Sequence, residues 1–317
     1  MSSAIDVRGL HKSYGDKVVL DGIDLNVAEG TIFSLLGPNG AGKTTAVQIL
    51  STLIAADAGE IRVAGHDLHQ HPEEVRAAIG VTGQFSAVDG LLTGRENLIM
   101  MADLHHLGRR EGRRRADELL GQFDLVEAGQ KLAMTYSGGM KRRIDLAMTL
   151  VGSPRIIFLD EPTTGLDPRS RHNMWQLIRQ LVADGVTVLL TTQYLEEADQ
   201  LADQIAVLDH GKLVAQGTPE QLKRLVPGGH IRLRFTAPEE FALAGQVLPS
   251  ASRDEDALVL QVPSDGSVHT LRALLARIDD ASLEVDELTV HTPDLDDVFF
   301  AVTGQPTAND DEKVTSK

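Results

Sequence analysis

The stretch of sequence that decides the fold is Gly37-Pro38-Asn39-Gly40-Ala41-Gly42-Lys43-Thr44. It follows an apolar run at 31–36, which predicts a buried strand, and it opens a helix-forming run at 44–53. A glycine-rich turn between a strand and a helix presents backbone N–H groups to phosphate oxygens, and the helix N-terminus adds partial positive charge. The sequence therefore predicts a phosphate-binding loop, with Lys43 reaching the β- and γ-phosphates and the Thr44 hydroxyl binding Mg²⁺.

A second predicted strand ends in two carboxylates, in the sequence Ile156-Ile157-Phe158-Leu159-Asp160-Glu161. A continuous apolar run is typical of a strand buried on both faces, and such strands deliver their carboxyl ends to the ligand edge of an open α/β sheet. Alone, the pattern would indicate an ordinary strand end. With the phosphate loop upstream, we expect Asp160 to hold the hydrated Mg²⁺ and Glu161 to orient or deprotonate the attacking water.

Another pair of glycines opens a predicted helix, in the sequence Tyr136-Ser137-Gly138-Gly139-Met140. A hydroxyl and two glycines at a helix N-terminus make a second anion site. One chain does not need two triphosphate-binding elements for one nucleotide, whereas two chains packed head to tail can each supply one face of a shared site. The sequence therefore predicts a homodimer.

Together with Thr164-Gly165-Leu166-Asp167-Pro168, these motifs resemble those of an ABC ATPase, over about residues 5–225. The resemblance implies that Tyr14 stacks on adenine, that Gln84 touches Mg²⁺ and links the site to a helical subdomain, and that Asp167 lies in a loop crossing the dimer interface. The cofactors implied are ATP and Mg²⁺, with Thr44, Gln84 and Asp160 around the metal. The full set of residues implied to contact the nucleotide is Tyr14, Gly37, Pro38, Asn39, Gly40, Ala41, Gly42, Lys43, Thr44, Thr45, Gln84, Ser137, Gly138, Gly139 and Asp167.

The chain departs from the family pattern at three positions. Met140 stands where the signature usually has glutamine, Tyr136 where it has leucine, and Gln193 where the family has its switch histidine. Glutamine can donate a hydrogen bond to a γ-phosphate, but it has no proton to exchange near neutral pH. We therefore expect two catalytic residues, Glu161 as the general base and Gln193 as a contact to the γ-phosphate.

The chain resembles the daunorubicin/doxorubicin-resistance branch of drug-exporting ABC ATPases. The resemblance rests on these departures, on an acidic terminal domain and on the stretch Leu295-Asp296-Asp297-Val298-Phe299. The resemblance implies ATP hydrolysis that powers export of a hydrophobic compound through a separate ABC-2 type permease, with the chain peripheral on the cytoplasmic face of the membrane. The alternative is a soluble ABC ATPase that is not coupled to transport. Such proteins are expected to carry two cassettes, a long coiled coil or a basic face, and none of these is evident in the sequence.

The predicted organisation has two domains of different character. Residues 1–226 read as an α/β P-loop NTPase core with an inserted helical subdomain at about 88–152. Residues 230–304 are acidic, and their predicted order βαββαβ indicates a small α+β ferredoxin-like domain. Its predicted elements are strands at 231–235, 247–252, 257–262 and 283–291, helices from 238 and at 268–278, and a last short helix at 295–302. Residues 305–317 form a polar tail that we expect to be disordered.

Composition narrows the class of partner. The formal net charge of −16 argues against a nucleic-acid partner, because phosphate binding needs a basic face. The absence of cysteine rules out disulfides and thiolate metal sites. No apolar run approaches the roughly 20 residues of a membrane span, and Asp6, Arg8 and Lys12 interrupt any export signal. Work at a membrane would therefore require a partner.

Overall fold

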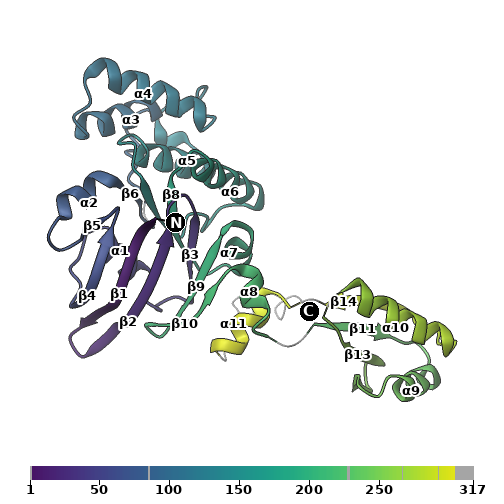
Figure 1. The fold of residues 1–317 in the computed structure, drawn as a ribbon. Helices are drawn as coiled ribbons and strands as arrows, with labels where there is room; N and C mark the ends of the chain where they lie inside the picture. Colours follow the sequence, from purple (N-terminus) through teal and green to yellow (C-terminus); the bar gives the residue numbers. More distant parts are fainter. Residues whose placement is uncertain (1, 85, 227–228, 266, 292, 304–317) are drawn as a thin grey trace. The chain divides into compact units, whose positions relative to one another are not determined.

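The chain forms two compact units, Met1–Pro219 and Glu220–Lys317. The computed structural model describes residues 2–84, 86–226, 229–265, 267–291 and 293–303 (Figure 1). Both units are mixtures of strands and helices, as the sequence predicts.

The centre of the first unit is a six-stranded sheet of order β10-β9-β3-β8-β7-β6. Its strands are parallel except β10, which pairs antiparallel with β9 at one edge. Every residue of β3, β7 and β8 is buried, because both faces of the sheet are covered. The bounds are β3 (Ile32–Leu36), β6 (Ile79–Thr82), β7 (Ile156–Asp160), β8 (Thr187–Thr192), β9 (Gln204–Asp209) and β10 (Lys212–Gly217).

Four neighbouring strands of this sheet end level with one another. Leu36 at the end of β3 pairs with Thr192 of β8, and Asp160 at the end of β7 pairs with Thr191. On the other side of β7, Leu159 pairs with Thr82 at the end of β6. The segments that follow these strands therefore leave the sheet along one edge, which is where ligands bind in open α/β sheets.

One face of the central sheet packs on an antiparallel sheet of order β2-β1-β4-β5 and on helices α1 and α2. Alternate residues of each central strand point to this side, for example Ile156 and Phe158 of β7, while Ile157 and Leu159 point to the other. The bounds are β1 (Ser3–Tyr14), β2 (Lys17–Ala28), β4 (Ala58–Val63), β5 (His66–Asp67), α1 (Lys43–Leu50) and α2 (Pro72–Ala78). Helix α1 is shorter than predicted, because the chain turns at Thr52, whose φ is 65°.

The other face is covered by helices, several of which come from the predicted helical subdomain (Figure 1). Within the described residues of 88–152 there is no strand, only an isolated bridge between Thr93 and Leu132, which confirms the helical prediction. Helix α3 starts with a capping box in which Thr93 and Glu96 satisfy each other's backbone N–H groups. The helices are α3 (Gly94–Leu104), α4 (Arg109–Gln122), η1 (Ala133–Thr135), α5 (Gly138–Thr149), α6 (Pro168–Ala183) and α7 (Leu195–Leu201).

The second unit contains an antiparallel sheet of order β12-β13-β11-β14, which gives the predicted βαββαβ sequence the split arrangement of a ferredoxin-like domain. Its core includes Ile231, Phe235, Leu260 and Leu274. The bounds are α8 (Pro219–Lys223), β11 (His230–Arg234), α9 (Pro238–Val247), β12 (Ser252–Asp254), β13 (Val259–Pro263), α10 (Val268–Asp280), β14 (Glu287–His291) and α11 (Leu295–Thr303).

Two predictions for this unit are wrong in detail. The strand predicted at 247–252 begins only at Ser252, as β12. Helix α9 continues to Val247, and the Leu248 N–H still donates to Ala244 O at 2.8 Å. Leu248 is fully buried there, and Val247 packs against the same core, so these two apolar residues complete the inner face of α9. The strand predicted at 283–291 begins only at Glu287. The tail predicted at 305–317 lies outside the described residues.

The length and apolarity of the helices decide whether any of them could span a bilayer. Among the described residues, no helix is both long enough and apolar enough to cross a membrane.

Candidate nucleotide-binding and hydrolysis site

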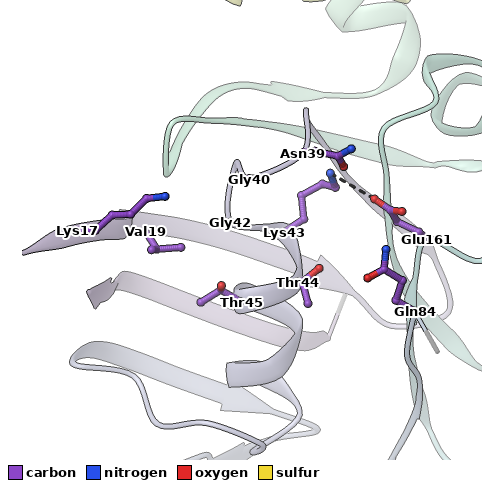
Figure 2. Close-up of a pocket in the computed structure, with 10 residues that line it drawn as sticks. All are labelled: Lys17, Val19, Asn39, Gly40, Gly42, Lys43, Thr44, Thr45, Gln84 and Glu161. Carbon is purple, nitrogen blue, oxygen red and sulfur yellow. Dashed lines mark ion pairs between the residues drawn. The ribbon is translucent and has the colours of Figure 1, made fainter. Parts of the chain in front are cut away.

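A cavity of about 370 Å³ lies where the level strand ends meet the start of α1 (Figure 2). It combines the loop after β3 with single residues from the segments after β6 and β7, and with two residues of β2. The structure thus brings together predicted residues that are far apart in the sequence. The lining residues are Lys17, Val19, Asn39, Gly40, Gly42, Lys43, Thr44, Thr45, Gln84 and Glu161.

The conformation of the loop explains its glycines. A Cβ on Gly37 would lie 2.2 Å from the carbonyl oxygen of Leu208, so no larger residue fits there. Gly42 has φ 110°, and a Cβ on it would lie 2.8 Å from Leu20 Cδ2. These constraints let the backbone curl tightly at the start of α1, where N–H groups can face phosphate oxygens.

Lys43 supplies the buried cation of the site. Its Nζ donates to the carbonyl oxygens of Gly37, at 2.7 Å, and Pro38, at 3.1 Å, and lies 3.7 Å from Glu161 Oε1. Burial lowers the pKa of the Lys43 ammonium, while the negative charges of Glu161 and Asp160 oppose that shift. An ammonium held in this low-dielectric setting attracts phosphate oxygens more strongly than an exposed one.

Asp160 and Thr44 place a carboxylate and a hydroxyl next to each other beside the loop. The Thr44 hydroxyl donates to Asp160 Oδ1 at 3.4 Å, and the Thr191 hydroxyl donates to the same oxygen at 2.5 Å. Asp160 is only 4% exposed. A carboxylate and a hydroxyl next to a phosphate-binding loop are the hard oxygen donors that Mg²⁺ prefers, and Gln84 adds an amide oxygen to the same cavity.

Glu161 has a backbone conformation that is unusual for a residue other than glycine. Its φ is 49°, in the left-handed region, where a side chain is disfavoured. The Glu161 N–H donates to the carbonyl oxygen of Thr191 at 3.2 Å, and the Thr164 hydroxyl donates to Glu161 Oε2 at 3.2 Å. Figure 2 shows the carboxylate facing Lys43, which places a candidate base inside the cavity.

Ser137, Gly138, Gly139 and Asp167 lie elsewhere on the same unit. Ser137 caps α5 by accepting from the Met140 N–H at 3.3 Å. A Cβ on Gly139 would lie 2.8 Å from Ser170 Oγ, and Ser170 donates to the two carboxylate oxygens of Asp167. The signature and the Asp167 loop therefore adjoin each other, and none of the four is among the described residues that line the cavity.

Tyr14 and Gln193 are also outside the cavity lining among the described residues. Tyr14 is 52% exposed and pairs across the β1–β2 turn with Lys17, which does line the cavity. Gln193 follows β8 directly and is half-buried. Their roles stay predictions from the family resemblance.

Some residues of the site belong to no sequence motif and could not be predicted from the pattern of apolar residues. Lys17 and Val19 reach the cavity only because β2 packs beside the loop, and Thr191 holds Asp160 from the neighbouring strand. Arg142 donates to four backbone carbonyls, three of them in the turn of Asp160 and Glu161, yet in the sequence it is one of several arginines on a helix.

The fold and the site define a P-loop ATPase, and comparisons with known proteins identify its kind. Residues 20–164 match the family model described as ABC transporter. The chain is 49% identical to the daunorubicin resistance ATP-binding protein DrrA2 of Streptomyces coeruleorubidus, over 98% of each chain. It is 47% identical to the daunorubicin/doxorubicin resistance ATP-binding protein DrrA of Streptomyces peucetius, over 96% of this chain and 93% of that protein. It is 37% identical to the Nod factor export ATP-binding protein I of Paraburkholderia xenovorans, over 96% of this chain and 98% of that protein.

Solved structures agree with this result. The structure of an ATP-binding subunit of an ABC transporter superposes with a TM-score of 0.63 at 28% identity, over 70% of this chain and 92% of that one. A nucleotide-free ATP-binding cassette gives the same fold with a TM-score of 0.63 at 22% identity. The chain belongs to the family of daunorubicin/doxorubicin resistance ATP-binding proteins among the ABC transporter ATPases. It is an ATPase.

We predict that Lys43→Ala abolishes ATP binding or turnover, because it removes the cation that faces the β- and γ-phosphates. Equilibrium binding of a fluorescent ATP analogue and phosphate release measure the two effects. Lys131→Ala, which removes an exposed lysine outside the cavity lining, is the matched control and should bind and hydrolyse ATP normally. Wild-type hydrolysis by Lys43→Ala would overturn the assignment of the loop.

Proposed function

We propose that this chain powers export of a hydrophobic, drug-like compound through a separate ABC-2 type permease, bound to it on the cytoplasmic face of the membrane. The observation that carries the proposal is similarity over nearly the full length to daunorubicin resistance ATP-binding proteins, and a cavity lined by Lys43, Thr44 and Glu161 supports it. The names of more distant relatives, which are export ATP-binding proteins, support the same direction of transport.

The chemistry of the site is phosphoryl transfer to water. Backbone N–H groups of residues 37–44 and the Lys43 ammonium hold the β- and γ-phosphates, and Gln193 donates to the γ-phosphate. Thr44, Asp160 and Gln84 would hold Mg²⁺, which when bound would neutralise negative charge on the phosphates. Glu161 orients the attacking water and accepts its proton. The Lys43 ammonium lies 3.7 Å from Glu161 Oε1 and helps to orient this carboxylate before the reaction.

We propose further that two chains pack head to tail around ATP. Ser137, Gly138, Gly139 and Asp167 form one contiguous surface that lies apart from the cavity lining of their own chain. A helix N-terminus with an exposed serine and an exposed glycine is suited to a phosphate, and a second chain can supply that phosphate. Each site is then completed by the signature of the partner.

The export proposal predicts that cells expressing this chain with the permease encoded beside it keep less of a fluorescent anthracycline than cells with the permease alone. Glu161→Gln should remove this difference, because it binds ATP but lacks the base that activates water. Glu196→Gln, at an exposed position on α7, is the control and should export normally. Equal drug retention with and without the active chain would favour the alternative of an ABC ATPase that is not coupled to transport.

The role of Gln193 leads to a separate prediction. Gln193→His should keep substantial ATPase activity, because both side chains can donate a hydrogen bond to the γ-phosphate, whereas Gln193→Ala should lose much of it. Loss of one hydrogen bond to a charged group corresponds to about 1.5–3 kcal/mol, or roughly a 10- to 100-fold lower rate. Phosphate release by the purified variants measures this. If the alanine variant hydrolyses ATP as fast as the wild type, Gln193 is not a switch residue.

A further inference from the structure

Arg142, on the second turn of α5, is a buried cation with an unusual set of partners. Its side chain is 12% exposed, and its guanidinium donates to four backbone carbonyls among the described residues. The acceptors are the carbonyl oxygens of Pro162 at 2.8 Å, Gly83 at 3.0 Å, Asp160 at 3.1 Å and Glu161 at 3.3 Å. The Asp145 carboxylate lies 3.5 Å away. Five donors in a rigid planar fork make arginine the side chain best able to satisfy several fixed acceptors at once.

Three of these acceptors are consecutive residues of the catalytic turn. Asp160 ends β7, Glu161 follows in the left-handed conformation, and Pro162 comes next. A left-handed residue other than glycine costs about 1–3 kcal/mol and persists only where its surroundings hold it. The Asp160 and Glu161 carbonyls belong to the two peptide planes that flank Glu161, and their bonds to one guanidinium fix the orientation of both planes. The bond to the Pro162 carbonyl fixes the next peptide. The position of the Glu161 carboxylate in the cavity therefore depends on Arg142.

The fourth acceptor connects the same guanidinium to the segment of Gln84. Arg142 binds the carbonyl of Gly83, directly before Gln84, and Asp145 accepts from the Ala87 N–H at 3.1 Å. Arg142 and Asp145 lie three residues apart on one face of α5, so they act as a pair. Burial raises the pKa of the Asp145 carboxyl, while the Ala87 N–H and Arg142 oppose that shift.

We infer that Arg142 is a positioning residue for ATP hydrolysis, which holds Glu161 and the segment of Gln84 at the geometry that the reaction needs. The inference rests on the proposed role of Glu161 as the base. Arg142 does not line the cavity among the described residues and so does not contact the nucleotide there. Its removal should therefore affect the rate of the chemical step and leave the affinity for ATP unchanged.

The test compares Arg142→Lys with Arg143→Lys in the purified full-length chain. Lysine keeps the charge but has one compact ammonium, which cannot satisfy four spread carbonyls. Arg143 is the matched control, because it is the next residue on α5 and also binds carbonyls. Those carbonyls belong to Phe123 and Asp124, which are not among the described residues that line the cavity. We expect Arg142→Lys to keep the ATP dissociation constant and to lose roughly 10²-fold in single-turnover hydrolysis, the scale of a misplaced catalytic group. Arg143→Lys should hydrolyse ATP like the wild type.

A double-mutant cycle with Glu161→Gln separates positioning from general destabilisation. If Arg142 acts through Glu161, adding Arg142→Lys to Glu161→Gln should cause little further loss of rate, whereas independent effects would multiply. Normal hydrolysis by Arg142→Lys, or an equal loss in Arg143→Lys, would overturn the inference, as would a full multiplicative loss in the double variant. Wild-type hydrolysis by Glu161→Gln itself would instead refute the proposed role of Glu161, and the inference with it.

Discussion

The pairing register of four parallel strands is the constraint on which the rest of the site depends. Because β3, β8, β7 and β6 end level, the loop at 37–44, Gln193, the Asp160–Glu161 pair and Gln84 all begin at one edge of the sheet. Neighbouring strands lie about 4.8 Å apart, so these four segments start within roughly 15 Å of one another. A slip of one residue in β7 would exchange the faces on which Asp160 and Glu161 point, and would break the site without unfolding the sheet.

Buried charge is the second constraint, because each charged group at this edge needs a partner to offset its desolvation. Lys43 is paired with Glu161 and two carbonyls, Asp160 accepts from two threonines, and Arg142 binds four carbonyls. The strained turn at Glu161 is held by the same contacts. Helix α5 carries Arg142 and is capped by Ser137. In the proposed head-to-tail dimer, the helix end that meets the partner's nucleotide therefore belongs to the helix that we infer to position Glu161.

The parts of the site that the sequence could predict are those whose requirements are local. The glycines of the loop depend on the local backbone conformation, and the apolar run before Asp160 depends on the burial of its own strand. The structure shows both features as predicted. Arg142 could not be predicted, because its partners at positions 83 and 160–162 meet only in the folded sheet. Val247 and Leu248 were misassigned to a strand because a short apolar run has no period that separates a strand from a helix end. For Tyr14 and Gln193, only the family resemblance suggests a role.

We propose that each nucleotide site is completed by the signature of a second chain. Because the chain has no native cysteine, disulfide cross-linking can test this packing directly. Asn39 and Gly138 are both exposed, and Gly138 has space for a side chain. Chains carrying Asn39→Cys and chains carrying Gly138→Cys, distinguished by tag size and both in a Glu161→Gln background, are mixed and oxidised. Head-to-tail packing around ATP predicts a mixed disulfide dimer that forms with ATP and Mg²⁺ and is lost without nucleotide. A cross-link whose yield ignores ATP, or one formed mainly between two Asn39→Cys chains, would contradict it.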